Sequence, residues 1–154
     1  MPALALSTGN LFSAVQPGGS LFGLQESNPV NIDVAYGGDA TNYGTASDPM
    51  VGGKIGGINV FGGGLALYNA SGKIAGGVGV SGDSSCADHF VAWVTRALLK
   101  LDNVRAGVNN GTDNIVYDIT NGASPSGWGH PQCSTASTIA ASFLTKVWPT
   151  GAHQ

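Results

Sequence analysis

The residues of this chain that are best suited to ligand chemistry are two histidines and two cysteines. His89 follows Asp88 in a predicted helix, close to Cys86, and His130 lies in the loop sequence WGHP shortly before Cys133. Neutral imidazole is the commonest metal ligand in proteins. A bond between the two cysteines would hold both histidines in one neighbourhood, where they suit a metal ion or a haem iron. The alternative for His89 is a half-exposed helix histidine that binds nothing.

Cys86 and Cys133 fit either a disulfide or two buried free thiols. Neither belongs to a CxxC pair, so their spacing gives no indication of a zinc site. The even count and the secreted-like composition favour one disulfide, which would tie the start of the predicted helix to the loop Gly127–Gln132. Such a bond would contribute about 3–4 kcal/mol by the chain-entropy relation. It would also place the protein in the periplasm or outside the cell.

Three further side chains are candidates for contact with a flat apolar ligand. Met50 offers a thioether that can ligate a haem iron, although most methionines only pack. Phe61 and Tyr68 offer flat apolar surfaces that suit a porphyrin and equally suit a protein core. The predicted cofactor-binding residues are therefore His89, His130, Met50, Phe61 and Tyr68, with His89 and His130 as the metal ligands.

The composition narrows the possible function classes. Charged residues make up 10% of the chain, against a typical value of about 25%, and glycine accounts for 25 of the 154 residues. The net charge is −3 and the six basic residues are scattered, which argues against a nucleic-acid-binding surface. No apolar run is long enough to span a bilayer. The weakly charged surface favours burial against other subunits, so we predict a homo-oligomer.

Periodicity and turn residues predict one α+β domain over residues 1–154. A β-hairpin is expected within residues 55–82, with its turn at Asn69–Gly72. The remaining predicted elements are a short helix at Ser7–Val15, a strand or turn at Leu21–Leu24, an ordered loop over Asn28–Pro49, a strand at Asn114–Thr120 and a helix at Ser137–Val147.

The clearest helix is predicted over Cys86–Leu101. Ser85 suits the N-cap, and Asp88 can reach back toward it as in a capping box. Three- and four-residue spacing places the apolar face of this helix at Phe90, Val94, Ala97, Leu98 and Leu101.

Glycines are unusually frequent in the predicted hairpin. They stand at Gly62–Gly64, Gly76, Gly77 and Gly79, and glycine is a poor strand residue. Several glycines in one sheet indicate that another backbone, or a flat ligand, approaches the strands closely.

The hairpin and the helix after it resemble the GlcG/HbpS family of haem-binding proteins, which includes the domain appended to PduO-type corrinoid enzymes. The similar residues are GGLAL at Gly63–Leu67, AGGVGVSG at Ala75–Gly82 and the helix residue Asp88. The resemblance implies a profilin-like fold, with a central antiparallel sheet flanked by helices. It also implies haem or a related tetrapyrrole as ligand, symmetric oligomers, and a role in haem storage, sensing or degradation.

The resemblance is incomplete at the start of the chain, and two other function classes stay open. Family members usually begin with a long helix, a strand pair and a second helix, which residues 1–30 do not supply. We therefore expect the later part of a longer or split chain, with a second chain supplying the missing elements. One alternative function is a small-metabolite enzyme or enzyme subunit, with a polar pocket from Asn59, Asp88, His89 and His130. The other is a structural subunit of an assembly.

Overall fold

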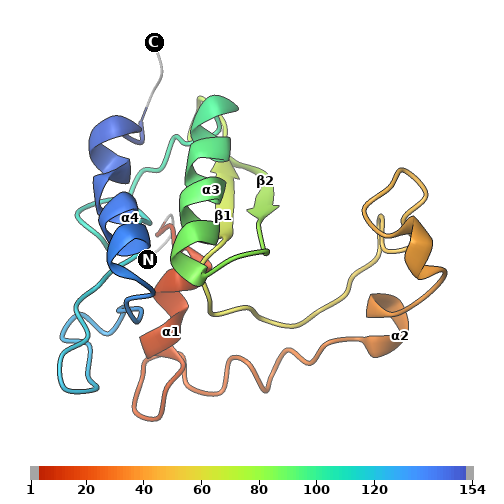
Figure 1. Cartoon of the computed structure of the whole chain (residues 1–154), viewed down its shortest axis with the longest axis horizontal. Coiled ribbons are helices and arrows are strands. Elements are labelled where there is room, and N and C mark those ends of the chain that lie inside the picture. Colours follow the sequence, from red (N-terminus) through yellow and green to blue (C-terminus); the bar gives the residue numbers. More distant parts are fainter. Residues whose placement is uncertain (1–3, 152–154) are drawn as a thin grey trace.

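The chain combines helices with one small sheet, as the computed structural model shows for residues 4–151 (Figure 1). The antiparallel strands β1 (Gly64–Tyr68) and β2 (Ile74–Gly79) form the sheet, which confirms the predicted α+β class. In this described part the helices are α1 (Leu11–Ala14), α2 (Ile32–Ala35), α3 (Ser85–Leu98) and α4 (Thr135–Val147), with 3₁₀ turns η1 (Thr8–Asn10) and η2 (Ala40–Asn42).

The predicted hairpin is confirmed. Its strands pair in antiparallel register, with an irregularity between Leu67 and Tyr68. The side-chain oxygen of Asn69 accepts hydrogen bonds from the backbone N–H groups of Ser71 and Lys73, which closes the turn in the way that asparagine commonly does. Within residues 4–151 no third strand joins the sheet, and β2 is exposed along most of its length.

Residues 114–120 do not form the predicted strand. Val116 makes a single isolated bridge to Gly129. Beyond it the Asp118 carboxylate accepts hydrogen bonds from Ser124 and Ser126, so the neighbouring segment turns around that side chain. A strand needs a partner whose backbone runs alongside it over several residues. The segment around Gly129 meets residues 114–120 only at the single bridge to Val116. The alternation of apolar residues was therefore misleading here.

Helix α3 is confirmed, with its ends shifted from the predicted positions. Ser84 is the N-cap rather than Ser85. Asp88 does reach back, but its carboxylate accepts from the N–H groups of Gly82 and Asp83 and so fixes the turn before the helix. The helix ends at Leu98 because the chain takes a left-handed conformation at Lys100, with φ of 57°.

The buried face of α3 differs from the predicted one. Phe90 is 37% exposed and Leu98 is 65% exposed, so the predicted apolar face is wrong at these two positions. Trp93 is buried instead, together with the polar side chains of His89 and Arg96. Nε2 of His89 and the two terminal nitrogens of Arg96 have hydrogen-bond partners inside the protein, and a count of apolar residues alone cannot anticipate that.

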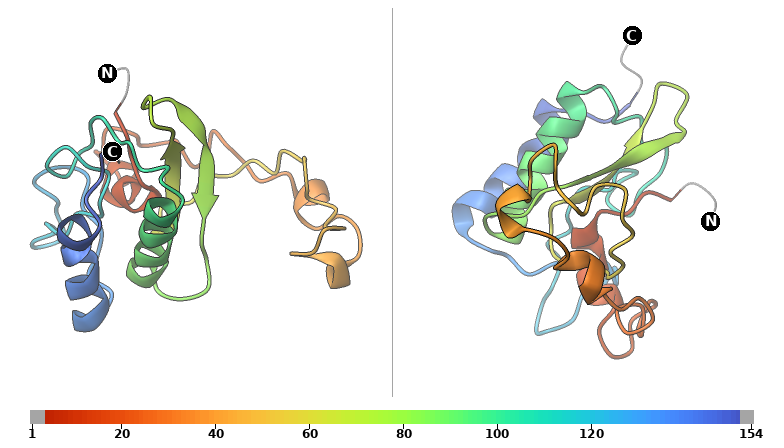
Figure 2. Two further views of the ribbon diagram at one scale, coloured as in Figure 1. Left: turned by 90° about the horizontal axis from the view of Figure 1, so that it is seen from above. Right: turned by 90° about the vertical axis from the view of Figure 1, so that its right-hand side faces the viewer.

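The core lies on both sides of α3. One side of this helix contacts β1 and the other contacts α4, as Figure 2 shows from above. Helix α4, capped by Ser134, confirms the predicted C-terminal helix. None of the helices in the described range is long and apolar enough to cross a membrane. The buried core residues are Leu65, Cys86, Ala92, Trp93, Ile115, Ala141 and Leu144.

Residues 28–57 extend away from the rest of the chain and carry α2 and η2 (Figures 1 and 2). The predicted loop over Asn28–Pro49 is thus interrupted by two short helical turns, and Leu21–Leu24 is a turn. Large apolar side chains of the extended segment are exposed, among them Tyr36 at 79% and Val51 at 76%.

Gly63 is a position where the close approach of another backbone requires glycine. Its φ is 114°, and a Cβ atom there would clash with the carbonyl oxygen of Val80. We expect Gly63→Ala to lower the free energy of unfolding by about 2–4 kcal/mol, because strain and overpacking add. Gly79→Ala is the matched control, since a Cβ at Gly79 meets open space. Urea denaturation followed by circular dichroism measures both, and equal losses in the two variants would contradict the assignment.

Candidate functional site

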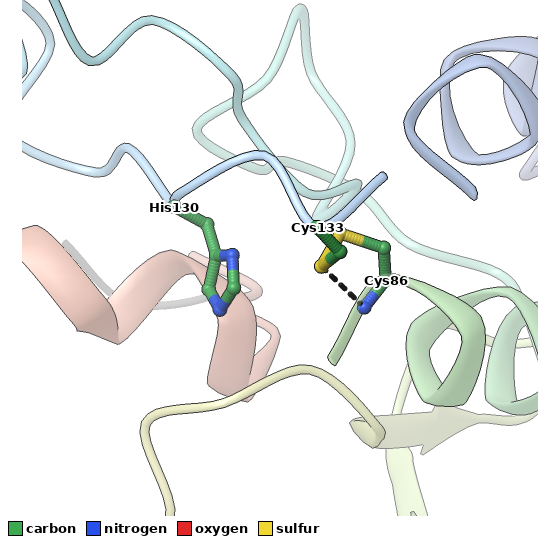
Figure 3. Close-up of side chains that lie close together, drawn as sticks. All are labelled: Cys86, His130 and Cys133. Atoms are coloured by element: carbon green, nitrogen blue, oxygen red, sulfur yellow. Dashed lines mark hydrogen bonds between the residues drawn. A yellow bond between two sulfur atoms is a disulfide. The ribbon is translucent and has the colours of Figure 1, made fainter. Parts of the chain in front are cut away.

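The predicted disulfide forms between Cys86 and Cys133, which are 47 positions apart. Cys86 lies in the first turn of α3, and Cys133 lies just before Ser134, the cap of α4. The backbone N–H of Cys86 also donates to the sulfur of Cys133, at 3.2 Å. As predicted, the bond ties the start of α3 to the loop that carries His130 (Figure 3).

His130 is held in one orientation beside the disulfide. Its Nδ1 lies 2.7 Å from the carbonyl oxygen of Pro131. Because a carbonyl only accepts, Nδ1 carries the proton, and Nε2 is left with a free lone pair. This Nε2 is buried and has no hydrogen-bond partner among the described residues. Burial also lowers the pKa of His130 below its usual value, which favours the neutral imidazole.

An open cavity of about 570 Å³ adjoins His130. Aromatic rings form part of its wall: the ring of Phe12 lies 5.3 Å from the ring of His130 and 6.4 Å from that of Phe61, between centroids. The complete wall is Phe12, Asn59, Phe61, Gly62, Ser81, Asp83, Ser84, Ser85, Asp88, His130, Pro131, Gln132 and Cys133. The cavity thus has apolar rings near its imidazole and hydroxyl and carboxylate groups elsewhere.

His89 lies in the core rather than at this cavity. Its side chain is fully buried, and its Nε2 lies 2.9 Å from the side-chain oxygen of Asn114. The backbone N–H of Ile115 lies between these two groups, 2.9 Å from the same oxygen and 3.2 Å from Nε2 of His89. None of the described cavities includes His89 in its wall.

Burial lowers the pKa of His89 to about 4. In the unfolded chain an ordinary histidine has a pKa of about 6.5 and binds a proton more readily. This contribution to stability is therefore complete above pH 6.5 and is lost as the pH falls toward 4. We expect His89 to account for about 3 kcal/mol of the acid destabilisation over that range. Denaturant titrations at pH 7 and pH 4 measure it, and His89→Gln should reduce the difference; an unchanged difference would contradict this prediction.

Met50 and Tyr68 lie away from the cavity. Met50 belongs to the extended segment 28–57, where its backbone N–H donates to Asp48. Tyr68 ends β1, where its N–H donates to the carbonyl of Leu101 and its side chain is 8% exposed. Burial raises the pKa of its hydroxyl. Of the five predicted cofactor contacts, the structure brings Phe61 and His130 to one cavity.

Phe12 is a cavity residue that the sequence did not single out. It lies on α1 and comes next to His130 through long-range packing, including a hydrogen bond of 2.6 Å from the Ser13 hydroxyl to the Gly129 carbonyl. No spacing rule connects two segments so far apart in the chain. The polar residues Asn59 and Asp88, considered for a metabolite pocket, also line the cavity, whereas His89 does not.

One glycine pattern near the cavity has the spacing of a dinucleotide-binding fingerprint. Gly77, Gly79 and Gly82 fit GxGxxG. Gly77 and Gly79 lie inside the antiparallel strand β2, however, and not in a turn that joins a parallel strand to a helix. The pattern therefore does not create a phosphate site.

The sequence and structure of the chain were compared with those of known proteins. No family model, curated protein or solved structure matches the chain.

Proposed function

We propose that this chain binds haem, or a closely related tetrapyrrole, in the cavity beside His130, and that His130 would hold the iron through Nε2. The observation that carries the proposal is the unpartnered Nε2 of a buried imidazole whose Nδ1–H is fixed by a backbone carbonyl. Metal-ligating histidines almost always have this second hydrogen bond.

The cavity has the size of a small-molecule site, and its end near His130 offers apolar surface to a flat ligand. Its volume of about 570 Å³ falls within the usual range of about 300–1,000 Å³ for small-molecule sites. Phe12 and Phe61 present aromatic surface next to the imidazole. When bound, haem would supply redox-active iron, while the protein would supply the nitrogen ligand and the apolar contacts.

The family-level proposal rests on the hairpin and α3. Their glycine pattern resembles the GlcG/HbpS family, and the hairpin forms where that pattern lies. We extend this resemblance to a profilin-like arrangement of the domain and to haem storage, sensing or degradation. The disulfide supports a periplasmic or extracellular location, because such bonds persist in oxidising compartments.

A comparison of haem with iron-free protoporphyrin tests the proposal. Both ligands quench tryptophan fluorescence, so their dissociation constants can be measured in the same assay. If His130 ligates the iron, haem should bind at least about tenfold more tightly than protoporphyrin, since a ligand bond adds to the shared apolar contacts. Equal affinities would contradict iron ligation, and no quenching by either would contradict the proposed site.

Self-association is a second proposal, favoured by the exposed apolar side chains of residues 28–57. Ile32, Tyr36 and Val51 are each more than half exposed and belong to the same extended segment, and apolar surface that gathers in one region commonly marks an interaction site. We propose that they pack against another copy, so that the chain forms a homo-oligomer. Light scattering after size-exclusion chromatography should give a multiple of the chain mass; a monomer at every concentration would contradict it.

A further inference from the structure

Three groups that bind thiophilic metals lie close together, and two of them, His130 and Cys133, line the cavity. One ring nitrogen of His130 and the sulfur atoms of Cys86 and Cys133 all lie within 4.8 Å of one another. Figure 3 shows the imidazole of His130 near the Cys86–Cys133 disulfide. In a tetrahedral zinc site, with Zn–S of about 2.3 Å and Zn–N of about 2.0 Å, the ligand atoms stand about 3.5–3.8 Å apart. The distance from the nitrogen to the sulfur atoms therefore exceeds the N–S spacing of a zinc site by at most about 1.3 Å.

The state of His130 is an independent observation that points to a ligand. Its side chain is 3% exposed, and its Nε2 has no hydrogen-bond partner within residues 4–151. Buried polar atoms without partners are rare, and an absent ion is one of their ordinary explanations. The contact of Nδ1 with the Pro131 carbonyl fixes the ring, and metal-ligating histidines almost always make a second hydrogen bond of this kind.

We propose that reduction of the disulfide creates a metal site in which Cys86, Cys133 and His130 hold one zinc-class divalent cation. While the sulfur atoms are bonded to each other they cannot bind as thiolates. A dithiol reductant breaks the S–S bond, is oxidised to its own disulfide, and leaves two thiols on the protein. Binding of the cation then releases the two thiol protons.

The position of the cysteines favours their thiolate forms. The N–H of Cys86, in the first turn of α3, already points at the sulfur of Cys133. Helix N-termini and their free N–H groups stabilise a thiolate. Cys133 also lines the open cavity, which gives the cation a route in and leaves room for water as a fourth ligand. This site goes beyond haem binding and needs no haem.

Cobalt titration of the reduced protein tests the proposal. The disulfide is first reduced with a phosphine, which is oxidised to the phosphine oxide and takes its oxygen from water. Excess phosphine is then removed under anaerobic conditions. We expect one cobalt ion per chain, with a thiolate-to-cobalt charge-transfer band that zinc abolishes. The oxidised protein should give no such band. His130→Gln should weaken cobalt binding by at least about tenfold, whereas Glu26→Gln, an exposed side chain outside the cluster, should not.

A second measurement needs no variant of the buried histidine. Zinc should slow alkylation of both cysteines in the reduced wild-type protein, as counted by intact mass, with circular dichroism confirming that the fold persists. Absence of the charge-transfer band, or alkylation at the same rate with and without zinc, would overturn the proposal. Unaltered cobalt affinity in a folded His130→Gln variant would also overturn it, because the imidazole would then not be a ligand.

Discussion

Replacement of Asp113 by alanine is expected to lower the free energy of unfolding by about 3–5 kcal/mol, the largest stability effect we predict. Both oxygens of Asp113 accept hydrogen bonds from Arg96, each at 2.7 Å, and both side chains are fully buried. Removing the carboxylate leaves the guanidinium charge buried without its bidentate partner, and the remaining contacts with the Ala66 carbonyl and the face of Trp93 compensate it in part.

Chemical denaturation of the wild-type protein and the variant measures this loss. Glu26→Ala is the matched control, because it removes an exposed carboxylate and should change stability by less than about 0.5 kcal/mol. The double change Arg96→Met with Asp113→Leu should recover most of the loss, since no unpaired charge remains. A loss below about 1 kcal/mol for Asp113→Ala would show that the pair is not buried as described.

Replacement of His130 by alanine is expected to abolish the preference for haem over protoporphyrin, a change of at least about tenfold in relative affinity. His130 supplies the imidazole of the cavity wall. Without it, the apolar contacts of Phe12 and Phe61 would hold haem and protoporphyrin alike. Fluorescence titration of the variant with both ligands measures the effect.

The matched control for this prediction is His89→Gln, which removes the imidazole of the second histidine that the sequence suggests as a ligand. The sequence alone favours His89 as a ligand as much as His130. In the structure the ring of His89 is fully buried and its Nε2 is bonded to Asn114, away from the cavity. A folded His89→Gln variant should therefore keep its preference for haem. Loss of the preference in this variant, with retention in His130→Ala, would reverse the assignment of the ligand.

Local patterns in the sequence were sufficient for the elements that depend on local interactions. The hairpin turn uses the side chain of Asn69 on its own neighbours, and α3 has a serine cap and an acidic first turn. The disulfide was predictable because the chain has two cysteines and a composition typical of secreted proteins. These features need no knowledge of distant segments.

The features that the sequence did not predict depend on contacts between distant segments. Arg96 occupies the buried face of α3 because Asp113 meets it there, and Phe12 reaches the cavity because α1 packs beside His130. The strand predicted at residues 114–120 is absent because no continuous partner lies beside it. Alternating apolar residues and helical spacing give no information about such partners.

The proposed zinc site also depends on contacts between distant segments, which the spacing of residues in the sequence does not show. Judged by spacing, the cysteines belong to no zinc motif. In space they are adjacent to each other and to an imidazole nitrogen, which gives the three ligands of the proposed reduced-state site. Metal sites assembled from distant segments are recognised from the arrangement of their ligand atoms, so the pattern of cysteines in the chain is a poor guide to them.

The most direct test of the central claim is a haem titration of the oxidised wild-type protein, of known intact mass and oligomer size, followed at the Soret band. We expect saturable binding of one haem per cavity, with a sharp, shifted band typical of histidine ligation. No shift, or a broad absorbance that rises without saturation, would contradict haem binding at this cavity.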